Sequence, residues 1–299
     1  MLTRIHLLCQ VAAPVAFSFI LAATSFKTAL IFVCCINILF FLPEIILIRY
    51  LHRAVPHLQK DSKGPEEASP TLSIVSQLVL GWKAYLQSRC FLLSVAFTLL
   101  FLTTLNPGPL LTAYLLTQGI NEVTIAFFQG AAAVFGILPT FFNRILFGCF
   151  GVSLTAVGSG WFQFSCLIGS AMFFFLPSMV QLPIISIWGE NYANWTVWPF
   201  LAFLVLSRVG LWMFDLSERQ IMQENVPEDQ RGLINSTESA LSNIFLLMSY
   251  GLGMIASQPS QFGWLVGISC SSVGLAAVCA SLWLCISPKP TSKSEKINV

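Results

Sequence analysis

Charge is what this sequence most lacks. Only 9% of its 299 residues are Asp, Glu, Lys or Arg, whereas 56% are hydrophobic, and a soluble domain usually carries about a quarter charged residues. This balance excludes a water-soluble fold. The formal net charge of +2 is also too small to indicate a nucleic-acid partner.

Catalytic and metal-binding signatures are scarce as well. Only three histidines are present, His6, His52 and His57, and the sequence contains no glycine-rich phosphate loop. The nine cysteines form no CxxC pair and fall mostly within or beside apolar runs, where cysteine is usually a small packing residue. We therefore predict a protein that is not an enzyme and has neither a resident cofactor nor a metal site of its own.

Apolar runs, by contrast, recur along nearly the whole chain. Each has about the 20 residues that a helix needs to cross a bilayer core, and none alternates as a membrane β-strand would. We predict an all-α integral membrane protein in contact with the lipid bilayer, with about eight transmembrane helices. The predicted spans are Leu8–Thr24, Ala29–Leu51, Cys90–Thr117, Val123–Ile145, Gly151–Leu176, Val197–Ser217, Ile234–Ala256 and Gly263–Ser287.

The connection between the second and third spans, residues 52–89, is polar and much longer than the others. Its segment 72–86 is a candidate interfacial helix. If the N-terminus is cytoplasmic, thirteen of the fifteen Lys and Arg residues also lie on the cytoplasmic side. The positive-inside rule therefore predicts that both termini are cytoplasmic. Asn194 then faces outward in an Asn-Trp-Thr sequon, which is an N-glycosylation acceptor on a secretory route.

A few charged residues fall inside the predicted spans. Glu44 follows Pro43 in the second span, Arg208 and Asp215 lie two helical turns apart in the sixth, and Glu238 is about one turn into the seventh. Charges in lipid are costly and usually mark a pathway or a pair between helices. For Glu44 and Arg208, an interhelical pair and a gate or coupling site are both open interpretations.

The third span contains the run Asn106-Pro107-Gly108-Pro109. Two prolines flanking a glycine interrupt the helical hydrogen-bond ladder, so we expect a discontinuous helix. Transporters bind ions at such breaks near the middle of the membrane. A proline kink that only shapes packing is the alternative, because membrane helices tolerate proline well.

From Ser207 the chain reads SRVGLWMFDLSERQIMQENVPEDQRGLINSTESAL. This stretch resembles the ferroportin family, whose tenth and eleventh helices carry R-x-G-L-W-x-F-D-L, then Q-E-N-V, then R-G-x-I-N. Tyr114 with Thr117-Gln118-Gly119 and Gln261-Phe262-Gly263 add to the similarity. The resemblance implies a bundle of the major-facilitator type, in which the eight spans correspond to helices five to twelve of twelve.

On this resemblance the chain divides into four regions. Residues 1–51 are the last two helices of the N-lobe, 52–89 the cytoplasmic linker between lobes, 90–287 the six-helix C-lobe, and 288–299 a cytoplasmic tail. The first four helices of the family are absent, which indicates an N-terminally truncated chain.

The family resemblance implies export of ferrous iron, or a related divalent metal, by alternating access. The Asp-Cys pair and the histidine that bind metal in the vertebrate C-lobe align with Gly108-Pro109 and Ser249. The chain therefore looks like a non-vertebrate member that does not bind hepcidin, in the plasma membrane or in a vacuolar or other organellar membrane. The missing ligands also leave open a transporter of a metal chelate or a small organic solute. The missing helices leave open a non-transporting membrane scaffold or regulator.

The resemblance further implies an inner gate where the lobes meet, formed by Asp215, Glu224, Asn225, Arg231 and Asn235, with Arg208 nearby. We expect Arg231 to pair bidentately with a carboxylate of the N-lobe, because its guanidinium forms a planar donor fork. The alternative is a positive-inside anchor at the start of a helix.

Overall fold

The structure, a computed structural model, describes residues 20, 24, 26–54, 74–179, 191–256 and 258–286. These residues form helices joined by short connections and contain no strand. They divide into two compact units, one of residues 8–78 and one that comprises the chain from Val79 onward. The predicted first span, most of the long linker before Ile74, and the predicted tail lie outside the described residues.

In the described part of the first unit, the chain forms one long helix, α2 (Phe26–Ala54), with Pro43 inside it. This helix contains the predicted second span, and the prediction of a helix there is confirmed. Glu44 lies at its middle. Helix α4 (Ile74–Gln87) begins in this unit and continues into the next one.

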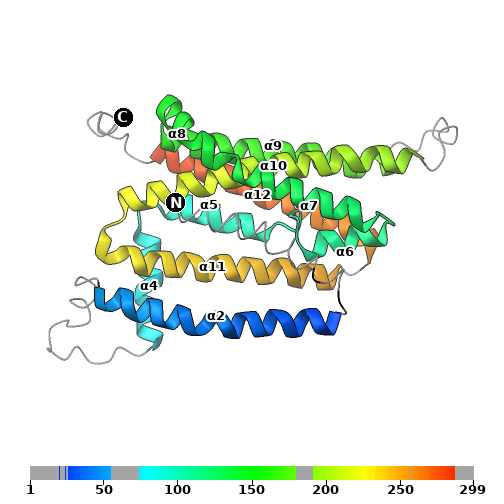
Figure 1. Cartoon of the computed structure of the whole chain (residues 1–299). Coiled ribbons are helices and arrows are strands. Elements are labelled where there is room, and N and C mark those ends of the chain that lie inside the picture. Colours follow the sequence, from blue (N-terminus) through cyan, green and yellow to red (C-terminus); the bar gives the residue numbers. More distant parts are fainter. Residues whose placement is uncertain are drawn as a thin grey trace. The chain divides into compact units, whose positions relative to one another are not determined.

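The second unit is a bundle of long helices (Figure 1). Helix α10 packs mainly on α9 and also contacts α7 and α8, whereas α12 lies against α9 and α5, and α11 lies against α5. The elements after α4 are α5 (Phe91–Leu99), η2 (Leu100–Leu102), α6 (Pro109–Thr117), α7 (Glu122–Ile137), α8 (Pro139–Phe150), α9 (Val152–Met179), α10 (Asn191–Asn225), α11 (Glu228–Ile255), η4 (Pro259–Gln261) and α12 (Phe262–Ile286).

Five described helices or helix pairs are long and apolar enough to span a bilayer, and a sixth span results if the bent pair Val79–Gln87 and Phe91–Leu102 counts as one. The chain bends by 108° between these two helices, so α4 runs across the direction of α5 (Figure 1). Helix α11 has 28 residues, about 42 Å at 1.5 Å per residue, but carries more polar side chains. The count of eight spans stays a prediction.

Two predicted spans are less regular than the sequence suggested. The span Val123–Ile145 is divided into α7 and α8, because Pro139 takes the first position of a new helix. The span expected to end at Ser217 continues as α10 for two more turns, to Asn225. This extension places Glu218 within the helix.

Candidate functional site

The predicted break in the third span is confirmed. The chain leaves helical geometry after Leu102, with Thr103 extended, and α6 starts only at Pro109. The backbone groups freed by the break are partly satisfied by α12. Ser269 Oγ accepts a bond from the Thr104 N–H at 2.9 Å, and Ser272 Oγ donates to the Leu99 carbonyl at 2.7 Å. Serines of a neighbouring helix thus allow irregular backbone inside an apolar bundle.

The turn before α6 is compact. The Gly108 N–H donates to the Asn106 carbonyl at 2.6 Å, and the Asn106 amide donates to the Thr103 carbonyl at 3.4 Å. Gly108 precedes the helix without a side-chain cap, and Pro109 occupies its first turn. The break therefore consists of residues 103–108 and carries no acidic side chain.

Arg208 of α10 reaches this break. Its Nη2 donates to the Leu105 carbonyl at 3.3 Å, and the residue is only 6% exposed. Its Nε has no hydrogen-bond partner among the described residues. Two groups of candidate residues from the sequence, Arg208 and the run Asn106–Pro109, are thereby brought to one place.

A buried acidic pair lies further along α10, near its C-terminal end. The carboxyl groups of Glu218 and Glu238 are close enough to interact directly. The Ser94 hydroxyl donates to Glu238 Oε2, and the Tyr85 hydroxyl lies 2.8 Å from Ser94 Oγ. A polar chain therefore links α4, α5, α10 and α11.

Glu218 was not among the residues that the sequence singled out, although it is 1% exposed. Because Glu218 lies just beyond the predicted end of the span, the sequence indicated a loop residue at this position. Asp215, one turn earlier, forms an ion pair with Arg219 Nε at 2.9 Å. Within the described residues, no group of three or more His, Cys, Asp or Glu side chains is arranged to hold a metal ion.

The remaining gate candidates lie around the α10–α11 turn. Arg231 Nη2 donates to the carbonyls of Gln223 at 2.8 Å and Val226 at 3.2 Å. These are carbonyls at the C-terminal end of α10, where a helix leaves its last acceptors unsatisfied. Arg231 therefore caps its own lobe, a contact that the motif did not predict. Asn225 bonds back to the Ile221 carbonyl, and Glu224 accepts from Gln220. Asn235 is exposed.

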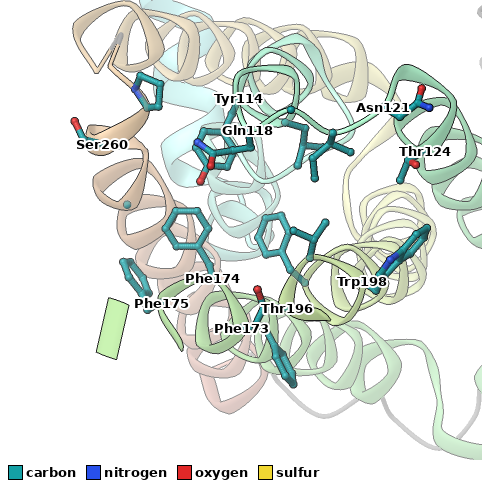
Figure 2. Close-up of a pocket in the computed structure, with 17 residues that line it drawn as sticks. Tyr114, Gln118, Asn121, Thr124, Phe173, Phe174, Phe175, Thr196, Trp198 and Ser260 are labelled. Atoms are coloured by element: carbon teal, nitrogen blue, oxygen red, sulfur yellow. The ribbon is translucent and has the colours of Figure 1, made fainter. Parts of the chain in front are cut away.

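The other end of the bundle holds a cavity of about 800 Å³. Figure 2 shows Tyr114 and Gln118 on one side of it and Phe174 on the other. The Tyr114 ring stacks on Phe262 with centroids 4.0 Å apart. Gly119, which adopts a φ of 75°, turns the chain at the cavity wall. The lining residues are aromatic, aliphatic, amide or hydroxyl in character, and none is charged.

Comparisons with known proteins agree with this geometry. The family model for Ferroportin1 (FPN1) matches residues 1–273. A chloroplastic solute carrier family 40 member 2 from Oryza sativa is 28% identical over 99% of this chain and 49% of its own length. Ferroportin from Homo sapiens is 28% identical over 66% of this chain and 42% of its own. The chain thus spans about half or less of the length of these relatives.

Solved structures show the same fold. A bacterial homologue of the iron transporter ferroportin in an outward-facing state superposes with a TM-score of 0.71 at 28% identity, and the match covers 95% of this chain and 62% of that one. The outward-facing bacterial homologue with soaked iron gives a TM-score of 0.68 at 25% identity, over 94% of this chain and 61% of that one.

Proposed function

We propose, because this chain belongs to the ferroportin family, that it is part of a transmembrane exporter of ferrous iron or a related divalent metal. As a member of a transporter family it is not an enzyme. Transport would proceed by alternating access, in which two helical lobes rock about a central path. The second unit supplies one lobe of such a machine, and α2 would belong to the other.

The observation that carries this proposal is the broken helix. Residues 103–108 are non-helical within an apolar bundle, and they are held by serines of α12 and by Arg208 of α10. Irregular backbone at membrane depth occurs where protein buries it or where it lines a path. A break that two neighbouring helices secure is therefore suited to contact a passing substrate.

We also place the ends of the lobe by the charge pattern. The turn between α10 and α11, with Arg231, would face the cytoplasm together with both termini, and the cavity beside Tyr114 would face outward. Figure 1 supports this polarity, since the α10–α11 turn and α8 point to one end of the bundle and the α6–α7 connection to the other. Asn194 would lie on the outer side, although its side chain is outside the described part of the chain.

The inner gate would form on the capped turn. By holding the Gln223 and Val226 carbonyls, Arg231 fixes the α10–α11 turn as one rigid surface. A guanidinium has five N–H donors, so those not used in the cap are available to a carboxylate of the opposite lobe. The other members of this surface would be Asp215, Glu224, Asn225 and Asn235.

Efflux of radiolabelled ferrous iron from cells that express the full chain tests the proposal. We expect faster efflux than from cells with an empty vector, and a reduction of several-fold in Arg231→Ala. Arg144→Ala is the matched control, because Arg144 is an exposed arginine in α8. Equal efflux with and without the protein, at confirmed membrane expression, would refute the proposed export of iron.

A further inference from the structure

The broken helix has a positive electrostatic character, which is unexpected for the path of a cation. Arg208 is 6% exposed, and its one described hydrogen bond goes to the Leu105 carbonyl. That bond uses one of five donors, and Nε has no partner among the described residues. A buried charge without a counter-ion is strongly unfavourable, so the arrangement favours an anion beside the guanidinium.

The described part of this unit offers no such anion. Its acidic residues are Glu122, at the start of α7, and those in the stretch from Asp215 to Glu238 at the α10–α11 end. The member nearest to Arg208 along α10 is Asp215, seven residues away, or about 10.5 Å along the helix axis. Asp215 is itself bonded to Arg219.

A second positive feature lies at the C-terminal end of the break. Helix α6 has nine residues, and its N-terminal end carries no side-chain cap. A helix N-terminus presents N–H groups and a partial positive charge. In transporters with discontinuous helices, such half-helix N-termini point at the anionic groups of substrates. The break thus combines a buried guanidinium with a helix N-terminus only three residues from Leu105.

We propose that the break between η2 and α6 binds a carboxylate, carried by a small organic acid that accompanies the metal as its complex. The planar fork of Arg208 matches the two oxygens of a carboxylate, and the start of α6 supplies further donors. This inference rests on the proposed function for the metal, whereas the carboxylate site itself rests on Arg208 and α6.

Citrate is a suitable probe, and thermal unfolding of the purified full chain at constant ionic strength is the first measurement. A ligand that binds only the folded protein stabilises it by RT ln(1 + [L]/Kd), so the unfolding temperature rises with ligand concentration. We expect citrate to stabilise the protein. Arg208→Lys keeps the charge but loses the fork, and should weaken citrate binding roughly 10-fold or more. Arg144→Lys, at an exposed site in α8, should leave it unchanged.

A second variant keeps the test valid if Arg208→Lys fails to fold. Asn106→Asp adds a negative charge at the break, one residue after the carbonyl that Arg208 bonds, and this charge repels a bound carboxylate. We expect this variant to fold, at the loss of the weak Asn106–Thr103 bond, and to lose stabilisation by citrate. The inference is overturned if Asn106→Asp binds citrate as tightly as the parent, or if citrate does not stabilise the parent at any concentration.

Liposomes that contain the full chain separate this inference from the proposed function. Ferrous iron is supplied anaerobically, either alone or as its citrate complex. Faster transport of the complex, lost in Asn106→Asp, supports a carboxylate at the break. Equal transport of iron with and without citrate, together with no stabilisation by citrate, overturns the carboxylate site and leaves metal export standing. Stabilisation by citrate without any movement of iron supports the carboxylate site and refutes metal export.

Discussion

The close contact of α9 and α10 at Gly210 allows a sharp test of the fold. A Cβ at Gly210 would lie 2.8 Å from the Ser159 carbonyl oxygen and 2.9 Å from the backbone nitrogen of Gln163. Both are backbone atoms of α9, and they cannot rotate away as a flexible side chain could. The two helices would have to separate by about 0.6 Å to reach 3.4 Å, the start of ordinary contact. Gly210→Ala should therefore disrupt the crossing.

The size of the effect follows from two opposing terms. Alanine is favoured over glycine within a helix by about 0.5–1 kcal/mol, whereas overpacking of a well-packed core costs about 1–3 kcal/mol. We expect Gly210→Ala to be destabilised by about 1–2 kcal/mol. Gly158 in α9 is the matched control, since a Cβ there meets nothing within 4 Å. Gly158→Ala should keep only the favourable helical term.

Thermal stability of the full chain in detergent, followed by the loss of its size-exclusion peak on heating, measures the difference. One kcal/mol corresponds to about 2–4 °C for a chain of 150–250 residues. Gly210→Ala should therefore melt several degrees below the parent protein, and Gly158→Ala at or above it. If Gly210→Ala melts with or above Gly158→Ala, the described packing of α9 on α10 is wrong.

Two further predictions concern contacts at the ends of the bundle. Glu238→Gln should preserve stability, because an amide can still bond to Glu218 and Ser94. Glu238→Ala leaves a buried carboxyl without its partner and should cost about 1–3 kcal/mol of stability. The same melting assay compares the two variants, and equal stabilities would contradict the pairing of Glu218 with Glu238. Tyr114→Phe should melt near the parent protein, because it keeps the ring stacked on Phe262. Tyr114→Leu should lose about 0.5–1.5 kcal/mol of stability beyond the effect of its smaller buried apolar area. A Leu variant as stable as the Phe variant would argue against the stack.

Local chemistry made the break predictable. Two prolines around a glycine cannot continue a helix, and the structure has a gap in helix at that run. The sequence did not show that irregular geometry begins earlier, at Thr103. The residues that permit this, Ser269 and Ser272, lie on α12, and the Thr104–Ser269 bond joins residues 165 positions apart. A pairing so distant cannot be read from the neighbourhood of the break.

Charge near the end of a span was the least reliable signal. The run that follows Ser217 contains Glu218 and Arg219, so hydropathy placed the end of the span before it. The helix continues with Glu218 buried beside Glu238 and with Arg219 paired to Asp215. Helix ends inferred from hydropathy therefore fail where acidic side chains find partners on other elements.

The motif likewise could not separate two contacts of Arg231. A basic residue at a helix start can act either in a gate or as a cap, and the structure shows the cap. The cap and the proposed gate are compatible, because the bonds described use a single nitrogen, Nη2. What would distinguish them is a carboxylate partner for the Arg231 donors that the cap leaves unused.

Electrostatics at the break bears on which species can pass this lobe. At an effective dielectric constant of about 20, a divalent cation about 5 Å from the Arg208 guanidinium would be repelled by roughly 6–7 kcal/mol, or about four to five orders of magnitude in occupancy. The pull of the carboxylates near Asp215, at about 10 Å, is weaker per charge because the interaction falls with distance. A bare divalent ion would thus be disfavoured next to the Arg208 guanidinium. A metal whose charge is covered by carboxylates would not meet this barrier.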